Sequence, residues 1–203
     1  MKKRRSKALW WSVLATVMAA VAPQAVLAEP LWARRVQTGV VACQFEGWSN
    51  DPDPGGLPVR SEPAPDAPAL GRLPPPRVIG LDELAVLVRV TGYRDGWFRI
   101  DTAFFPSEAD ANNRQSAAVF RGNGWVPSAM VKATLGSDAL MVAPRRDAKR
   151  KASLVGKRGG FPITPDTIAV KRLLSCNGTW VEADTEFGIG WVERVCARQL
   201  GSC

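Results

Sequence analysis

The side chains that most often carry out acid–base and metal chemistry are scarce in this sequence. Its 203 residues contain no histidine. This excludes Ser-His and Cys-His nucleophile pairs, a histidine general base and every zinc site that needs an imidazole ligand. No serine stands at Ser-x-x-Lys spacing from a lysine, which removes the serine-lysine type of nucleophile as well. The sequence therefore predicts a protein that is not an enzyme, with no catalytic residue, no metal and no cofactor.

Four cysteines are the remaining residues with distinctive chemistry, and they are Cys43, Cys176, Cys196 and Cys203. None of them forms a Cys-x-x-Cys pair, so two disulfides are favoured over a metal site. Three pairings are possible. The preferred one joins Cys176 to Cys196, which are close in sequence, and Cys43 to Cys203, which would tie together the two ends of the chain that follows a leader.

Residues 1–28 have the pattern of a cleavable signal peptide. Five basic side chains come first, an apolar stretch follows at residues 8–22, and Val26 and Ala28 supply small residues before Glu29. Pro23 ends the apolar stretch well short of the roughly 20 residues that a membrane-spanning helix needs. We therefore expect an exported protein, periplasmic or secreted, with no stable membrane insertion after cleavage.

Removal of this leader changes the interpretation of the charge. The whole chain has 27 basic and 19 acidic residues, and without the leader 22 basic residues face the same 19, a net charge of +3. This small excess does not predict a nucleic-acid partner. A local basic patch remains in a segment expected to be a loop, residues 145–158, and its members are Arg145, Arg146, Lys149, Arg150, Lys151, Lys157 and Arg158.

The part of the chain after residue 54 contains a repeat. Residues 57–59 (Leu-Pro-Val) precede Trp97 by 40 positions, and residues 140–142 (Leu-Met-Val) precede Trp180 by the same distance, an offset of 83. A Gly-Trp-Val segment closes each unit, at residues 124–126 and 190–192. In this alignment Leu70 corresponds to Leu154. The repeat predicts a duplicated unit.

Short strands separated by turns are expected in both units. Residues 85–91 and 168–174 are rich in β-branched and apolar side chains, and turn residues follow each of them. Asn177-Gly178 is the strongest of these turn signals, because both residues accept the positive φ of a type I′ turn. Proline-rich segments at residues 63–68 and 74–76 must lie in loops. The predicted class is all-β.

The first unit is longer than the second by 17 residues, which fall between Asp101 and Asn123. This insertion begins with Phe104 and Phe105. A long hairpin loop of this kind either contributes to binding or is simply tolerated.

These landmarks resemble the bacterial SH3 (SH3b) domain family. In the first unit the resemblance lies in residues 57–61 (Leu-Pro-Val-Arg-Ser), Pro63, Leu73, and the segments 86–90, 96–98 and 124–126. The second unit departs from the pattern, with Ala143 aligned to Arg60. The resemblance implies two tandem SH3-like barrels, at residues 55–134 (with an inserted loop, 101–123) and 135–203, after an N-terminal strand or arm at 29–54.

The same resemblance implies recognition of peptidoglycan or of a peptide. Aromatic side chains are the candidates for such a site, and those expected near a groove are Tyr93, Trp97, Phe104, Phe105 and Trp180, whereas Trp125 and Trp191 are expected in the core. Two alternatives stay open. One is a structural or scaffold subunit that binds an envelope protein, and the other is docking of the basic patch on anionic polymers or lipids.

Overall fold

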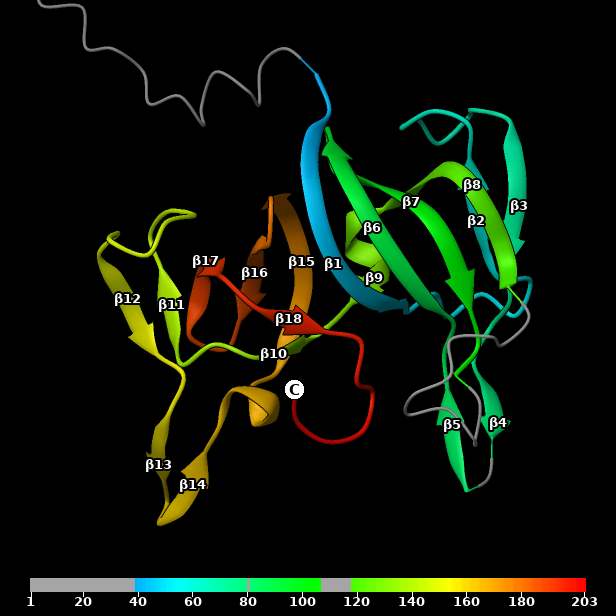
Figure 1. The fold of residues 1–203 in the computed structure, drawn as a ribbon. Coiled ribbons are helices and arrows are strands. Elements are labelled where there is room, and N and C mark those ends of the chain that lie inside the picture. The colour runs from blue at the N-terminus through cyan, green and yellow to red at the C-terminus, as the bar shows by residue number, and fades with distance from the viewer. Residues whose placement is uncertain (1–38, 80, 107–117) are drawn as a thin grey trace, which may run out of the picture.

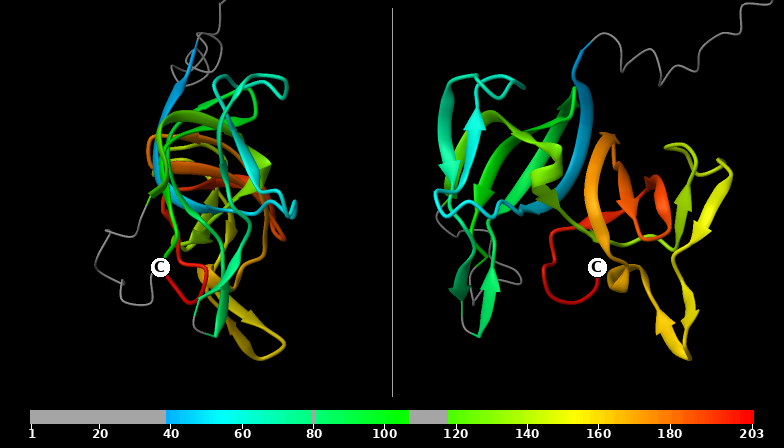
Figure 2. Two further views of the ribbon diagram at one scale, coloured as in Figure 1. Left: turned by 90° about the vertical axis from the view of Figure 1, so that its right-hand side faces the viewer. Right: turned by 180° about the vertical axis from the view of Figure 1, so that it is seen from behind.

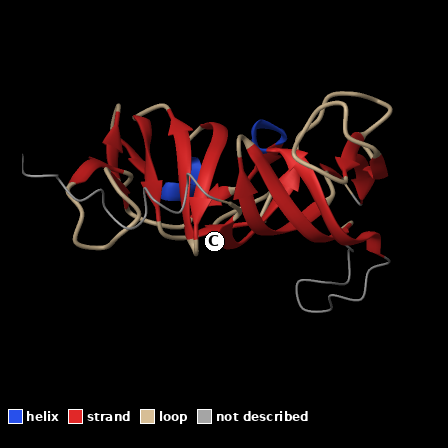
Figure 3. Ribbon diagram, turned by 90° about the horizontal axis from the view of Figure 1, so that it is seen from above, coloured by secondary structure: helices blue, strands red, loops and turns tan. Residues whose placement is uncertain are grey.

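The computed structural model describes residues 39–79, 81–106 and 118–203, and within these ranges nearly all of the regular secondary structure is strand (Figure 1). The predicted all-β class is therefore confirmed. Two short 3-10 helices accompany the strands, as Figure 3 shows. The predicted leader, residues 1–28, and residues 107–117 of the predicted insertion lie outside the described residues.

The strands follow one another in two groups. The first group is β1 (Val41–Ser49), β2 (Leu57–Arg60), β3 (Ala69–Leu73), β4 (Arg77–Ile79), β5 (Asp82–Leu84), β6 (Leu87–Arg94), β7 (Trp97–Phe104), β8 (Ala118–Pro127), η1 (Ser128–Met130) and β9 (Val131–Lys132). The second group is β10 (Thr134–Leu135), β11 (Ala139–Met141), β12 (Arg150–Ser153), β13 (Gly156–Arg158), β14 (Phe161–Ile163), η2 (Pro165–Thr167), β15 (Val170–Asn177), β16 (Trp180–Thr185), β17 (Gly188–Val192) and β18 (Val195–Cys196).

The five strands of the smaller of the two main sheets follow the same order as the first five strands of the larger one. The seven-stranded sheet runs β3-β2-β8-β7-β6-β1-β9, and it curls into a half-barrel. The five-stranded sheet runs β12-β11-β17-β16-β15, so each of its strands has a counterpart in the first sheet. Two hairpins, β4–β5 and β13–β14, form separate two-stranded sheets at equivalent points of the two units. A shared strand order is the arrangement that a duplicated sequence would produce.

Strand pairing corrects the alignment of the two units. Arg60 lies opposite Trp125, and Met141, 81 positions after Arg60, lies opposite Trp191. The offset is therefore 81 in β2 and β11, and 83 applies to the β6–β7 and β15–β16 hairpins, before the insertion in the first unit. Burial explains the difference, because Val59 and Leu140 are both fully buried and occupy the inward-facing position.

The same correction applies to the next strand. Leu73 and Leu154 are the equivalent buried residues, whereas Leu70, which the sequence aligned to Leu154, is 53% exposed. The loops between these strands are also equivalent at the offset of 81. The backbone N–H of Ala67 donates a hydrogen bond to the carbonyl of Ala64, and that of Ala148 donates the matching bond to the carbonyl of Arg145. The residue that departs from the expected pattern is thus Met141 and not Ala143, because Met141 occupies the place of Arg60.

The central hairpins of the two units turn differently. In the first unit Asp95 and Gly96 both have positive φ, 50° and 84°, as a type I′ turn requires. In the second unit Asn177 pairs with Trp180, so the central residues are Gly178 (φ 61°) and Thr179. The predicted type I′ turn at Asn177-Gly178 is therefore wrong. Glycine at the first central position is typical of type II′ turns.

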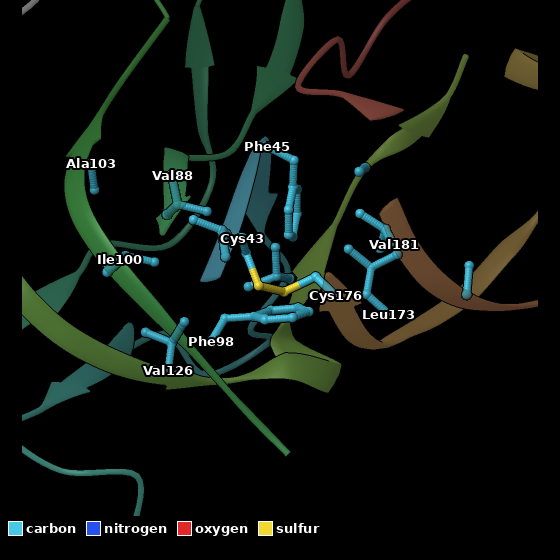
Figure 4. Close-up of a cluster of buried hydrophobic side chains, with 14 of the residues drawn as sticks. Cys43, Phe45, Val88, Phe98, Ile100, Ala103, Val126, Leu173, Cys176 and Val181 are labelled. Atoms are coloured by element: carbon cyan, nitrogen blue, oxygen red, sulfur yellow. A yellow bond between two sulfur atoms is a disulfide. The ribbon is translucent and has the colours of Figure 1, made fainter. Parts of the chain in front are cut away.

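Strand β1 joins the two sheets. Inside the first sheet it pairs with β6 and β9. It also forms a parallel bridge to the second sheet, in which the backbone N–H of Gln44 donates to the carbonyl of Gly178 and the N–H of Gly178 donates to the carbonyl of Ala42. The Cys43–Cys176 disulfide crosses the same junction, with Cα atoms 5.7 Å apart (Figure 4). Lys132 on β9 reinforces it by donating to the backbone oxygens of β15, and partial burial there lowers the pKa of Lys132. Figures 1 and 2 show β1 and β15 side by side.

The observed disulfides contradict the preferred pairing. Cys43 pairs with Cys176, and Cys196 pairs with Cys203. Cys176 lies on β15 and its side chain points toward β1, whereas Cys196 lies on β18, which pairs with β10 instead. The C-terminal disulfide closes a short loop that carries Gln199, whose amide group exchanges two hydrogen bonds with the backbone of Ala85, at 2.7 and 2.8 Å. Both bridges therefore serve the junction between the sheets.

Buried side chains of both sheets form one continuous core. Phe45 of β1 packs edge-on against Phe98 of β7, with ring centroids 5.3 Å apart. On the other side of the Cys43–Cys176 bridge, Leu173 and Val181 of the second sheet are fully buried (Figure 4). Because the core is shared, the solvent-facing side of one sheet has a fixed orientation relative to that of the other. In the described ranges, no helix is long and apolar enough to cross a membrane.

We predict that the two disulfides differ in their contribution to stability. Cys43–Cys176 spans 133 residues and Cys196–Cys203 spans 7, so the chain-entropy model gives about 5 kcal/mol for the first and about 2.5 kcal/mol for the second. Urea unfolding of the double variants C43A/C176A and C196A/C203A measures this difference. An equal or larger loss in C196A/C203A would contradict the assigned role of the long-range bridge.

Candidate functional site

The closing Gly-Trp-Val segments place a tryptophan on the outer face of each sheet. A side chain at Gly124 would collide with Val59, and one at Gly190 would approach Leu140 to 2.6 Å. Each glycine therefore faces inward where two strands meet closely, and the valine two positions later is fully buried as well. Because side chains alternate along a strand, Trp125 and Trp191 must lie on the opposite, outer face.

In the first sheet this outer tryptophan is covered. The guanidinium of Arg94 lies 5.3 Å from the Trp125 ring centroid, and Glu62 of the loop after β2 holds Arg94 in an ion pair of 3.6 Å. Trp125 is only 7% exposed as a result. The expectation that Trp125 is buried is thus confirmed, although it lies under a surface ion pair and not in the central core.

In the second sheet the equivalent tryptophan is open. The positions that correspond to Arg94 and Glu62 hold Asn177 and Ala143, which carry no charge and form no such ion pair. Trp191 is half-buried and lines a groove of about 400 Å³. The expectation that Trp191 belongs to the core is therefore not met. We name this feature the Trp191 groove, and its walls are Val142, Lys149, Arg150, Lys151, Glu182, Ile189, Gly190 and Trp191.

The Trp191 groove combines positive charge with apolar surface. Lys149, Arg150 and Lys151 are exposed and supply positive charge along one wall, from the start of β12 and the residue before it. Val142 and Ile189 are 53% and 42% exposed and add apolar surface. Such a groove can hold a ligand that has carboxylate or phosphate groups beside an apolar or ring-shaped part.

One acidic side chain also lines the Trp191 groove. Glu182 lies opposite Trp191 in the strand pairing and accepts a hydrogen bond of 2.7 Å from the hydroxyl of Ser175. This bond fixes the carboxylate in one place, where it can receive an amino group of a ligand. Sequence reasoning missed Glu182, Val142 and Ile189. The alternation of Ile189 and Trp191 with two buried residues was the available signal.

The predicted basic patch is divided in the structure. Residues 145–158 are not one loop, because the strands β12 and β13 occupy half of this segment. Lys149, Arg150 and Lys151 line the groove, while Arg146 pairs with Glu193 and Arg145 with Asp147. Lys157 and Arg158 lie on the separate β13–β14 hairpin, where Arg158 contacts Glu186 at 2.7 Å. Strand formation therefore separates charges that are neighbours in sequence.

The five predicted binding aromatics have different surroundings. The Tyr93 ring packs edge-on against Phe98, and its hydroxyl accepts a hydrogen bond from Gly96, so it supports the turn. Phe105 is 6% exposed beneath the guanidinium of Arg77, 3.6 Å from its ring centroid. Phe104, Trp97 and Trp180 are half-buried on β7 and β16. None of the five lines the Trp191 groove.

A larger cavity, of about 480 Å³, lies beside the C-terminal disulfide. Asp138, Asp166 and Glu193 line it, together with Phe45 and Leu135 of the core. Glu193 is already paired with Arg146, and Phe45 and Leu135 are almost fully buried. We assign this cavity to packing between the two sheets.

Comparison with known proteins gives little further information. No protein-family model matches the chain, and no curated protein matches it. A solved structure that matches is that of NlpC2 from Trichomonas vaginalis, with 11% sequence identity and a TM-score of 0.28 over 79% of this chain. The chain spans about half of that protein, 51% of its length. A TM-score of this size assigns neither a fold family nor a function to the chain.

We predict that the two outer tryptophans differ in their importance for stability. Trp125→Ala should lower the free energy of unfolding by about 3–5 kcal/mol, the usual cost of removing a buried aromatic ring. Trp191→Ala should cost less than about 2 kcal/mol, because its ring is still partly in water. Urea denaturation measures both values. A larger loss for Trp191→Ala would show that Trp191 is a packing residue.

The Arg158–Glu186 pair gives a pH-dependent prediction. The hydrogen bond from Arg158 lowers the pKa of the Glu186 carboxyl below its ordinary value of 4.5. This contribution to stability is present at neutral pH and is lost as the pH falls through the lowered pKa. In Arg158→Gln the pKa of Glu186 should rise toward 4.5, as followed by NMR titration of the carboxyl carbon. Arg145→Gln is the matched control and should leave it unchanged.

Proposed function

We propose that this chain is an exported, non-catalytic binding protein of the bacterial cell envelope, built from SH3b-like units, which binds peptidoglycan or a similar peptide in the Trp191 groove. The observation that carries the proposal is the difference between the two outer faces. One tryptophan is closed off by Arg94 and Glu62, and its equivalent lies open between cationic and apolar walls. The half-buried Trp191 ring and the exposed Val142 and Ile189 line one groove, and apolar surface rimmed by polar residues is typical of a binding site.

The chemistry of the groove suits a glycan-linked peptide. An indole face accepts the apolar face of a sugar or an aliphatic side chain. Lys149, Arg150 and Lys151 attract free carboxylates of the peptide. Glu182, held by Ser175, can receive a free amino group. A ligand that carries all three kinds of group would use every wall of the groove.

The cysteines support a non-catalytic role in an oxidising compartment. All four cysteines of the chain are joined in disulfides, so no thiol is free to act as a nucleophile. Disulfides persist mainly in exported proteins. Within the described ranges, no group of three or more histidine, cysteine or acidic side chains is placed to hold a metal ion.

Sedimentation with purified peptidoglycan sacculi tests the proposal. The purified protein should be retained at about 0.1 M salt and several-fold less at about 1 M, where the Debye length falls from roughly 10 to roughly 3 Å. Trp191→Ala should weaken retention at least about tenfold, as expected for an aromatic anchor. Trp180→Ala is the matched control, since Trp180 lies on the same sheet outside the groove, and it should be retained like the parent protein.

A second pair of variants separates the groove from general charge attraction. Lys149→Ser/Arg150→Ser removes two groove cations, and Lys157→Ser/Arg145→Ser removes two cations elsewhere. Loss of retention in the first variant alone supports the groove. Equal losses in both would favour docking of the whole basic patch on anionic polymers. Absence of retention in the parent protein would contradict binding to peptidoglycan and favour an envelope protein as the partner.

A further inference from the structure

The two small hairpins project from the same side of the molecule. β4–β5 extends from the first unit and β13–β14 from the second, and both point the same way in Figure 1 and in the two further views of Figure 2. Each is a two-stranded sheet with few interactions of its own, and such hairpins are marginally stable without support. Their common direction places two prongs on one end of the protein.

A side-chain contact holds each prong, at the base of the first and next to the turn of the second. Arg77 stacks on the buried ring of Phe105, with its guanidinium carbon 3.6 Å from the ring centroid. Arg158 pairs with Glu186 at 2.7 Å and lies 5.6 Å from the ring centroid of Phe187. The prongs are thus held in defined positions and are not loose extensions.

Apolar side chains are exposed on both prongs. Val78 and Leu81 are 73% and 101% exposed on the first, and Phe161 is 76% exposed on the second. These are among the most exposed large apolar side chains in the described part of the chain. Each prong therefore presents at least one large apolar side chain that a partner surface can cover.

The charges of the two prongs are opposite. The first carries Asp82 and Glu83, both exposed, beside its anchoring Arg77. The second carries Lys157 and Arg158 and has no acidic residue at positions 155–163, but Glu186 pairs with Arg158, so its positive charge rests on Lys157. A flat anionic surface would attract the second prong and repel the first. A second copy of this chain offers the complement of both.

We propose that the protein forms a two-fold symmetric dimer in which the acidic β4–β5 prong of each copy contacts the basic β13–β14 prong of the other. Two-fold rotation about an axis perpendicular to the plane of the two prongs brings each prong onto the unlike prong of its partner. The same contact then occurs twice and closes the assembly. Leu81 and Phe161 are the apolar residues that this contact covers. The proposal goes beyond the Trp191 groove and does not depend on it.

Charge reversal tests the proposal. The contact is small, so we expect a dissociation constant on the order of 10–100 µM. Sedimentation equilibrium over a concentration series should show the mass approaching twice that of the chain. Glu83→Lys and Lys157→Glu should each weaken self-association at least tenfold, because each places like charges together at both contacts. Circular dichroism checks that both variants remain folded.

Mixing the two variants is the decisive measurement. A pair made of one Glu83→Lys chain and one Lys157→Glu chain has opposite charges at both contacts, so the mixture should recover the two-chain mass. Leu81→Ser/Phe161→Ser should stay monomeric, and Trp191→Ala should dimerise like the parent protein. A parent protein that remains monomeric up to millimolar concentration, or a mixture that does not recover the dimer, would overturn the proposal.

Discussion

The junction at strand β1 is the constraint on which the rest of the structure depends. β1 is an inner strand of the first sheet, yet its remaining edge bonds to Gly178 and its Cys43 is linked to Cys176 of the second sheet. Backbone pairing, a disulfide and a shared core act at the same place. The two sheets therefore have a fixed relation to each other, and that relation decides where the Trp191 groove and the two prongs lie.

The duplicated design gives a comparison inside one chain. Both sheets use an inward glycine and an inward valine to turn a tryptophan outward, and both keep the same strand order. What differs is the cover. Arg94 and Glu62 close the first face, and uncharged residues at the equivalent positions leave the second face open. The difference in cover at these two positions accompanies the difference in exposure between Trp125 and Trp191.

The same principle applies to charge. Seven basic residues are close together in the sequence between positions 145 and 158, but strands β12 and β13 direct them to different places. Three line the groove, two form ion pairs near the loop after β11, and two belong to a prong. A local density of charge in the sequence is therefore not a patch on the surface unless the backbone keeps the side chains on one face.

The sequence by itself determined the β class and the existence of two related units, because strand alternation, turn residues and repeated Gly-Trp-Val segments are local signals. It also indicated that the cysteines form two disulfides. Only the tertiary structure decided how they pair, since Cys43 and Cys176 meet through strands 133 positions apart. The register of β2 and β11 and the openness of Trp191 were likewise settled by which side chains the core accepts and which neighbours cover the ring. These features depend on contacts between residues far apart in the sequence, and local patterns do not specify such contacts.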